Sequence, residues 1–402
     1  MSIRRRAETL LVRYHAIRAH SELLCAPLAL EDYVPQPVAE VSPPKWHLGH
    51  TSWFFEVLIL KPHLQGYNEF DPRLAFVFNS YYESLGDRVV RHHRGALSRP
   101  TVAEVMAFRA YVDSHMVALL ERGIDGEVEQ LVEQALQHEQ QHQELLLTDI
   151  KYILGENPLV PAYAQAGVAT AVDLAQEHPP QEGSGMRWHE WPGGEIEVGH
   201  SGGGFAFDNE RGRHRAYLNR MRLRDALVSN AEYLEFIADG GYSKHGLWHA
   251  DGWDWVRGQR RTAPLYWRED PEQSSGWAHY TLSGLQPLPD ESPVTHVNFY
   301  EASAFCTWAG WRLPTEFEWE ALAPGMDWGQ RWEWTGSAYL PYPGFRATDG
   351  ASGEYNGKFM ISQMVLRGAS YATPPGHGRL TYRNFFYPSQ RWQYTGIRPA
   401  QD

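Results

Sequence analysis

The chain has 402 residues, of which 43% are hydrophobic and 21% are charged, so it is long enough for two or more domains with hydrophobic cores. The formal net charge of −13 argues against nucleic acid or an anionic membrane surface as a partner, because no basic patch is evident beyond Arg4 to Arg6. The two cysteines, Cys25 and Cys306, exclude a disulfide scaffold and a thiolate metal cluster. No stretch approaches about 18 consecutive apolar residues and no apolar signal core is seen, which indicates a cytoplasmic protein.

Four helical patterns make up the first half of the chain and predict a helix bundle. They cover residues 3–25, 43–61, 101–122 and 127–154. Ser42 is expected to cap the second helix, and Thr101 with Glu104 has the spacing of a capping box for the third. Asp125 can cap the fourth helix, and Gly155 is a natural stop for it.

Two histidines, His138 and His142, lie four residues apart in the fourth helix. Residues at this spacing point from one face of a helix, so the two imidazoles can bind one metal ion. Leucine and alanine side chains share that face, which indicates that the histidines point into the bundle. With 19 histidines in 402 residues, however, chance alone supplies roughly one such pair. Hydrogen-bonded core histidines are therefore the alternative unless a third ligand is present.

A third candidate ligand lies near the start of the second helix. His50 shares a helical face with two tryptophans and a phenylalanine, so it is expected to point inward. His47 lies about 60° away from His50 around the helix axis, and spacing alone does not exclude it. We expect a metal site formed by His50, His138 and His142, with His47 as the weaker choice.

The character of the sequence changes near residue 180. Residues 177–185 combine glycine, proline and polar residues and are typical of a linker, so we expect domains at residues 1–176 and 186–402. The second half is rich in glycine, proline and tryptophan and has few long periodic runs. Short strands at 196–198 and 365–367 and short helices at 230–239 and 299–309 predict an irregular α+β domain with tryptophans in its core.

Residues 42–56 and 138–144 resemble the metal-binding motifs of the ergothioneine-biosynthetic sulfoxide synthases, whose first half is a DinB-like four-helix bundle. The second half is similar to the formylglycine-generating-enzyme (sulfatase-modifying-factor) domain, a variant of the C-type-lectin fold. The motifs that carry this similarity are residues 208–211, 293–298, 312–320, 332–335 and 365–370. The resemblance implies a two-domain α+β protein, with a DinB-like four-helix bundle followed by a C-type-lectin-like domain.

The resemblance also implies a non-haem Fe(2+) enzyme that uses O2. Such an enzyme joins the sulfur of cysteine or γ-glutamylcysteine to the imidazole C2 of N-α-trimethylhistidine (hercynine), giving a sulfoxide in ergothioneine biosynthesis. Carried over to this sequence, the iron ligands are His50, His138 and His142. Three neutral imidazoles on one side of the iron leave open positions at which a substrate thiolate and O2 can bind side by side.

Residues that bind hercynine are implied by the same resemblance. Gln141 and Asn384 correspond to residues near the hercynine imidazole. Phe385 and Phe386, with Tyr387, follow Asn384 and are expected to face the trimethylammonium group, since aromatic faces attract cations. The alternative for Gln141 is a buried amide that ties helices together.

Two arginines, Arg88 and Arg91, match the spacing of the pair that receives the carboxylate of the thiol substrate. The alternative is that both are solvated. Phe386 stands where the actinobacterial relatives have an acidic residue, so recognition of the thiol differs and free cysteine becomes a plausible donor.

A catalytic tyrosine is the third implied feature. In the relatives it lies in a loop of the second domain, but the corresponding stretch, residues 343–358, is short and its only tyrosine is Tyr355. Tyr81 and Tyr82 are our preferred catalytic candidates, because they lie on the same segment as Arg88. Packed aromatic side chains are the alternative for all three.

Competing functions are weighed against the same residues. A formylglycine-generating enzyme needs a C-terminal cysteine pair, and residues 365–398 contain no cysteine. A related synthase that uses histidine itself, or selenium in place of sulfur, keeps the same three histidines and stays open. A non-catalytic lectin-like binding module fused to a bundle, with core histidines, is the alternative from a different class.

Overall fold

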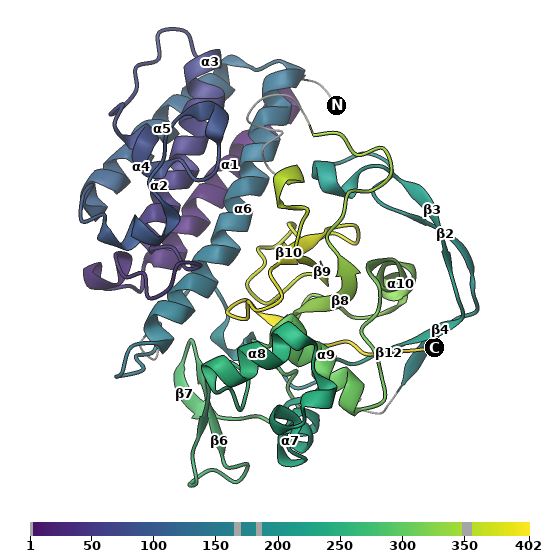
Figure 1. Cartoon of the computed structure of the whole chain (residues 1–402). Coiled ribbons are helices and arrows are strands. Elements are labelled where there is room, and N and C mark those ends of the chain that lie inside the picture. Colours follow the sequence, from purple (N-terminus) through teal and green to yellow (C-terminus); the bar gives the residue numbers. More distant parts are fainter. Residues whose placement is uncertain (1–2, 165–169, 182–186, 348–355) are drawn as a thin grey trace. The chain divides into compact units, whose positions relative to one another are not determined.

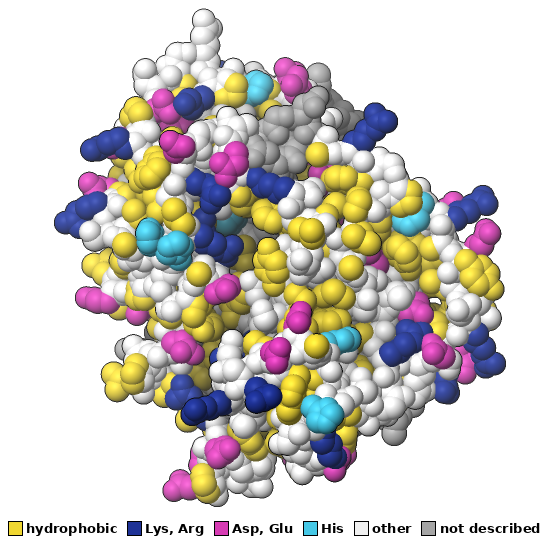
Figure 2. Space-filling model, viewed as in Figure 1, with side chains coloured by type: hydrophobic (Ala, Val, Ile, Leu, Met, Phe, Trp, Pro, Cys, Tyr) yellow, Lys and Arg dark blue, Asp and Glu magenta, His cyan; other side chains and the backbone are white. Residues whose placement is uncertain are grey.

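The computed structural model describes residues 3–164, 170–181, 187–347 and 356–402. Two compact units are present. The first comprises Met1–Leu174 with Leu282–Gly284, and the second comprises Ala175–Thr281 with Leu285–Asp402. None of the helices in the described ranges is long and apolar enough to cross a membrane. Acidic and basic side chains are interspersed over the face shown in Figure 2.

The first unit is a bundle of four long helices, as predicted (Figure 1). Helix α1 packs against α5 and α6, and α2 packs against the same two partners. Helix α2 continues through a π-helical turn at Glu56–Leu60 into the short α3, and α4 follows in the connection to α5. The bounds are α1 (Ile3–Cys25), α2 (Pro44–Phe55), α3 (Lys61–His63), α4 (Leu74–Phe78), α5 (Val102–Arg122) and α6 (Gly126–Gly155).

Two of the three predicted helix caps are confirmed. The Thr101 side chain accepts from the Glu104 backbone N–H, Glu104 caps in return, and Asp125 accepts from the first N–H groups of α6. The Ser42 prediction is wrong, because α2 begins at Pro44 and its cap position is Pro43. Ser42 instead forms hydrogen bonds with two buried charged side chains. Its N–H donates to Asp149 Oδ2 at 2.7 Å, and its hydroxyl accepts from a buried arginine side chain.

A buried carboxylate, Glu139, ties three helices of the bundle together. It accepts hydrogen bonds from Arg18 at 2.9 Å, Arg109 at 2.7 Å and Ser21 at 2.6 Å. Burial acts to raise the pKa of the Glu139 carboxyl, but Arg109 and Arg18 outweigh it and hold this pKa below its usual value. The charged form is therefore the one that the bundle stabilises.

The second unit is built from short strands and short helices, as predicted. The sheet orders are β1-β4-β12, β10-β9-β8-β11, β2-β3 and β5-β6-β7. All neighbours in the first three sheets are antiparallel except β11 and β8. The strands are β1 (Trp188–Trp191), β2 (Gly194–Val198), β3 (His214–Leu218), β4 (Met221–Arg224), β5 (Trp267–Glu269), β6 (Trp277–Thr281), β7 (Gly284–Pro287), β8 (Trp332–Ala338), β9 (Met364–Gly368), β10 (Asn384–Phe386), β11 (Thr395–Gly396) and β12 (Ala400–Gln401).

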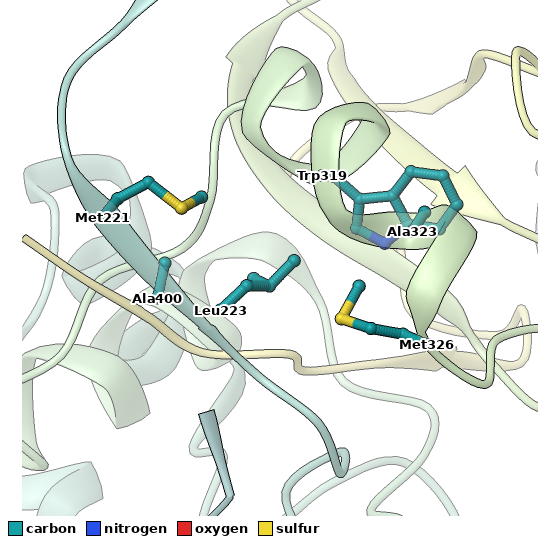
Figure 3. Close-up of a cluster of buried hydrophobic side chains, with 6 residues drawn as sticks. All are labelled: Met221, Leu223, Trp319, Ala323, Met326 and Ala400. Carbon is teal, nitrogen blue, oxygen red and sulfur yellow. The ribbon is translucent and has the colours of Figure 1, made fainter. Parts of the chain in front are cut away.

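Helices of the second unit cover the sheets and complete its core. They are α7 (Asn230–Ala238), α8 (Ala250–Gln259), α9 (Phe299–Trp308) and α10 (Glu316–Leu322). Trp319 of α10 is fully buried and packs with apolar side chains of β4 and β12 (Figure 3). Trp332 and Trp334 of β8 are also buried, so the predicted tryptophan core is confirmed.

Part of the predicted linker is packed into the second unit. The Glu177 carboxylate accepts from the Tyr394 hydroxyl at 2.8 Å, and the His178 carbonyl accepts from Ser292 at 2.8 Å. Gln181 bonds to the backbone of Leu227. The composition of residues 177–181 is that of an open linker, and it gives no sign of these partners because they lie far away in the sequence. Residues 182–186 lie outside the described part of the chain.

Candidate metal centre

Three histidines converge in the core of the bundle. His50 comes from α2, and His138 and His142 come from successive turns of α6. One ring nitrogen of each lies within 4.8 Å of the other two, and the ring centroids are 4.6 to 5.0 Å apart. This is the group that the sequence predicts.

The packing around His50 fixes the orientation of its ring. Trp46 stacks on one side with a centroid separation of 4.5 Å, and Trp53 stacks at 5.4 Å. His50 Nδ1 lies 2.6 Å from the carbonyl oxygen of Phe78. Because a carbonyl only accepts, Nδ1 carries the proton and Nε2 carries a lone pair. This Nε2 is buried and has no hydrogen-bond partner in the described ranges, as expected of a metal ligand without its metal.

All three imidazoles are held in the neutral form. Burial is the largest cause that lowers the pKa of His50, His138 and His142 well below the usual value. Neighbouring imidazoles lower these pKa values further, since like charges repel. Phe54 stacks on His138 with a centroid separation of 3.9 Å. Three neutral nitrogen donors at this spacing fit one divalent transition metal.

His47 lies beside this group rather than in it. Its Nδ1 is 2.9 Å from Nδ1 of His142, and its Nε2 is 3.0 Å from Oδ2 of Asp149. Both ring nitrogens of His47 are therefore engaged by side chains. Of the two candidates on α2, the structure brings His50 into the donor group.

The two predicted arginines lie at the surface of the same unit. Arg88 is partly exposed and makes a two-bond ion pair with Glu83, at 2.9 and 3.1 Å. Arg91 is exposed and donates to the carbonyl of Glu40 at 2.5 Å. Among the described residues, no hydrogen bond joins either arginine to the three histidines. Binding of the thiol carboxylate by Arg88 and Arg91 therefore stays a prediction.

A third arginine, Arg94, is buried and was missed from the sequence. Its guanidinium donates to the hydroxyls of Ser42 at 2.9 Å and Ser80 at 3.0 Å, and lies 3.4 Å from the ring centroid of Trp46. Burial, followed by the nearby Arg91, lowers the pKa of Arg94 well below its usual value. The available signal was the three-residue spacing of the arginines at 88, 91 and 94.

The tyrosine pair lies one aromatic layer from the histidines. Tyr82 is buried, and its ring lies 5.7 Å from that of Trp53 and 5.8 Å from that of Phe54. Tyr81 is half-buried and stacks on Tyr82, with the two hydroxyls 3.5 Å apart. The pair therefore joins the surface of the bundle to the aromatic side chains that stack on His50 and His138. Tyr355, the alternative, lies outside the described residues.

The residues expected to bind hercynine fall in both units. Gln141 is half-buried on α6 and precedes His142. Asn384 opens β10, and its Oδ1 accepts from the Phe385 N–H at 2.9 Å. Phe385 stacks on Tyr339 at 4.1 Å, and Phe386 meets the edge of Trp392 at 5.8 Å. One face of Phe385 is thus already covered, and the assignment of these residues to hercynine stays a prediction.

Two family models match the chain in succession. Residues 13–146 match the DinB superfamily, and residues 176–331 match the sulfatase-modifying factor enzyme 1-like domain. The chain is 28% identical to a hercynine oxygenase of Mycolicibacterium thermoresistibile, over 90% of this chain and 88% of that protein. The chain thus combines these two domains and is similar to hercynine oxygenases over most of its length.

Further relatives show how far this similarity extends along the chain. A hercynine oxygenase of Mycolicibacterium smegmatis is 29% identical over 66% of this chain and 70% of its own length. A formylglycine-generating enzyme of Streptomyces coelicolor is 30% identical, but over only 36% of this chain and 48% of its own length. The similarity to named oxygenases over most of the chain supports an oxidoreductase, and the three histidines are a possible metal site in it.

Proposed function

We propose that the chain is an Fe(2+)- and O2-dependent sulfoxide synthase that joins the sulfur of cysteine or γ-glutamylcysteine to the imidazole C2 of hercynine. The observation that carries the proposal is the group of three neutral imidazoles, two buried and one half-buried, in a chain related to hercynine oxygenases over most of its length. In the balanced reaction, the thiol S–H and the imidazole C–H are oxidised and O2 is reduced. One oxygen atom enters the sulfoxide and the other leaves as water.

The three histidines suit iron in this role. Bound iron supplies open coordination positions for the thiol sulfur and O2 and exchanges electrons with them. The chain's part is to keep His50, His138 and His142 neutral and oriented, which burial and the stacked Trp46 and Phe54 do. A substrate thiol bound there would lose its proton, since metal binding favours the thiolate.

Substrate recognition is proposed from the residues of both units that match the family resemblance. Arg88 and Arg91 are proposed to receive the carboxylate of the thiol, because guanidinium groups form charge-assisted bonds with carboxylates. Gln141 and Asn384 are proposed to contact the hercynine imidazole, with Phe385 and Phe386 beside its trimethylammonium group. Tyr81 or Tyr82 is proposed to supply a proton during the reduction of O2, as a phenol can do for a strongly basic oxygen.

The deciding experiment is anaerobic reconstitution of the purified protein with Fe(2+), followed by air, hercynine and each thiol in turn. We expect a product with the atoms of both substrates plus one oxygen and less two hydrogens, identified by its mass. Reactions without iron and with the His138→Ala variant are the controls. Histidine in place of hercynine tests the related synthase. If neither thiol gives the product with either imidazole, the proposed function is wrong.

A further inference from the structure

A chain of three side chains, Asp149, His47 and His142, links the buried end of α6 to the metal ligands. Oδ2 of Asp149 lies 3.0 Å from Nε2 of His47, and Nδ1 of His47 lies 2.9 Å from Nδ1 of His142. Asp149 and His47 are 2% and 3% exposed, so water has little access to these bonds. Because water has little access, the donor and the acceptor of each hydrogen bond must come from these side chains themselves.

The chemistry of the groups determines where the protons are. A carboxylate only accepts, so Nε2 of His47 carries a proton and donates it to Asp149. An imidazole that carries its one proton on Nε2 has a bare Nδ1, which must accept from Nδ1–H of His142. The remaining nitrogen of His142, Nε2, then carries a lone pair. The opposite arrangement would place a proton on His142 Nε2 and prevent it from binding a metal.

Asp149 is itself held in place. Its Oδ2 accepts from the Ser42 backbone N–H at 2.7 Å, and the hydroxyl of Ser42 accepts from the guanidinium of Arg94 at 2.9 Å. Ser42 thus connects the carboxylate of Asp149 with the buried guanidinium of Arg94. This arrangement explains why Ser42 does not cap α2.

The other ligand on α2 is oriented by the same logic but with a different partner. His50 donates from Nδ1 to the Phe78 carbonyl, which leaves Nε2 for the metal. The hydrogen-bond acceptor for His50 is a backbone carbonyl. The acceptor for His142 is the imidazole of His47, which donates in turn to the Asp149 carboxylate. Outer partners of this kind fix ligand tautomers in many metal sites.

We propose that His47 and Asp149 are positioning residues that hold His142 in the Nδ1–H tautomer, so that its Nε2 is presented to the metal. The proposal rests on the proposed metal centre and gives a role to two residues that do not ligate. Because the two act in series through His142, their effects on metal affinity should not add.

The first test reads the tautomers in the metal-free protein. Long-range 1H–15N spectra of protein labelled at histidine distinguish Nδ1–H from Nε2–H imidazoles, and loss of signals in His47→Gln and His142→Ala assigns the two residues. We expect His47 as the Nε2–H tautomer and His142 as the Nδ1–H tautomer. Nε2–H at His142, or protons on both nitrogens of His47, would overturn the proposal whether or not the protein is a sulfoxide synthase.

The second test measures the affinity for Co(2+), a spectroscopic probe of the site, by chelator competition. His47→Phe and Asp149→Ala should each weaken binding by about ten- to a hundredfold, and the double variant should be no weaker than either. His47→Gln should recover part of the loss, because its amide can accept from His142 and donate to Asp149 at once. His115→Phe is the matched control, since His115 bonds to the Tyr111 carbonyl on α5.

The background of His142→Ala separates positioning from general damage. With His142 absent, His47→Phe should cause no further loss of Co(2+) affinity, whereas a packing defect would cost the same as in the wild type. An equal loss in both backgrounds, or an unchanged affinity in folded His47→Phe, would overturn the proposal. Failure of the wild type to bind Co(2+) would instead reject the metal centre itself.

Discussion

Nη2 of Arg109 lies 2.7 Å from Oε1 of Glu139 in the middle of the bundle, and both side chains are almost completely buried. The two residues are 30 positions apart and come from α5 and α6. Arg18 of α1 binds the other oxygen of the same carboxylate, so the charged Glu139 links α1, α5 and α6. Glu139 directly follows His138 in the sequence.

Glu139→Gln is expected to destabilise the bundle by about 3 to 5 kcal/mol, because it leaves two buried guanidinium groups without their shared carboxylate. Urea unfolding followed by circular dichroism measures the change. Glu127→Gln, at an exposed position in the first turn of the same helix, should stay within about 0.5 kcal/mol of the wild type. Equal stability of the two variants would show that the buried network contributes nothing.

His138→Ala is expected to abolish retention of iron and turnover together, because a two-imidazole site holds a divalent metal weakly. Metal analysis after anaerobic reconstitution and desalting should give about one iron per chain for the wild type and almost none for the variant. His63→Ala, at an exposed position of the same unit, should retain full iron. A His138→Ala protein with stoichiometric iron would remove this group from consideration.

The helices and the histidine pair could be predicted because the signals are local. Apolar periodicity gives the four helices, and a four-residue spacing places His138 and His142 on one face. Ser42 shows the limit of this reasoning, since its cap position was judged from the adjacent prolines. Its actual partner, Asp149, lies 107 residues away.

Buried polar partners could not be predicted for the same reason. Nothing near Arg94 in the sequence indicates that it, rather than Arg88 or Arg91, is the buried member of the series. In the second unit, β11 has two residues and pairs in parallel with residues of β8 that lie 63 positions earlier, so no local pattern reveals it. The fold of the second unit was therefore predicted from its resemblance to family motifs and not from the periodicity of its hydrophobic residues.

Arg88→Gln is expected to raise the KM for the thiol by roughly ten- to a hundredfold and to leave the KM for hercynine nearly unchanged, since a charge-assisted bond contributes about 1.5 to 3 kcal/mol. Steady-state kinetics with each substrate varied in turn measures both. Arg73→Gln is the control, because Arg73 forms a similar ion pair with Asp71. Equal losses for both substrates would make Arg88 structural.

Stability of the second unit is expected to fall as the pH falls below about 6.5, the usual pKa of histidine. Burial, with the nearby Arg379, lowers the pKa of His377 to about 3. Between these values the unfolded chain binds a proton that the folded chain excludes, so stability is complete above pH 6.5 and is lost on acidification. At pH 5 the loss from this one group is about 2 kcal/mol.

His377→Gln should therefore reduce the difference in unfolding free energy between pH 7 and pH 5 by about 2 kcal/mol. Tryptophan fluorescence reports mainly on the second unit, because only Trp46 and Trp53 of the 16 tryptophans lie in the first. The exposed His245 provides the control variant, His245→Gln. An unchanged pH dependence in His377→Gln would show that this imidazole does not titrate on unfolding.

Tyr81→Phe or Tyr82→Phe is expected to change the product rather than the binding of iron or substrates. Each substitution removes only a hydroxyl, and the stacking of the two rings is retained. Without the phenol as a proton donor, the sulfoxide yield should fall and oxidation of the thiol to a sulfinic acid should rise, since O2 is still consumed. Mass spectrometry of both products measures the ratio, with Tyr111→Phe on α5 as the matched control. Tyr82 is buried against Trp53 and Phe54, which stack on His50 and His138, while Tyr81 is closer to solvent. A larger effect at Tyr82 would indicate that the buried hydroxyl, and not that of Tyr81, is the proton donor. An unchanged product ratio in both variants would return the role to Tyr355 or to water.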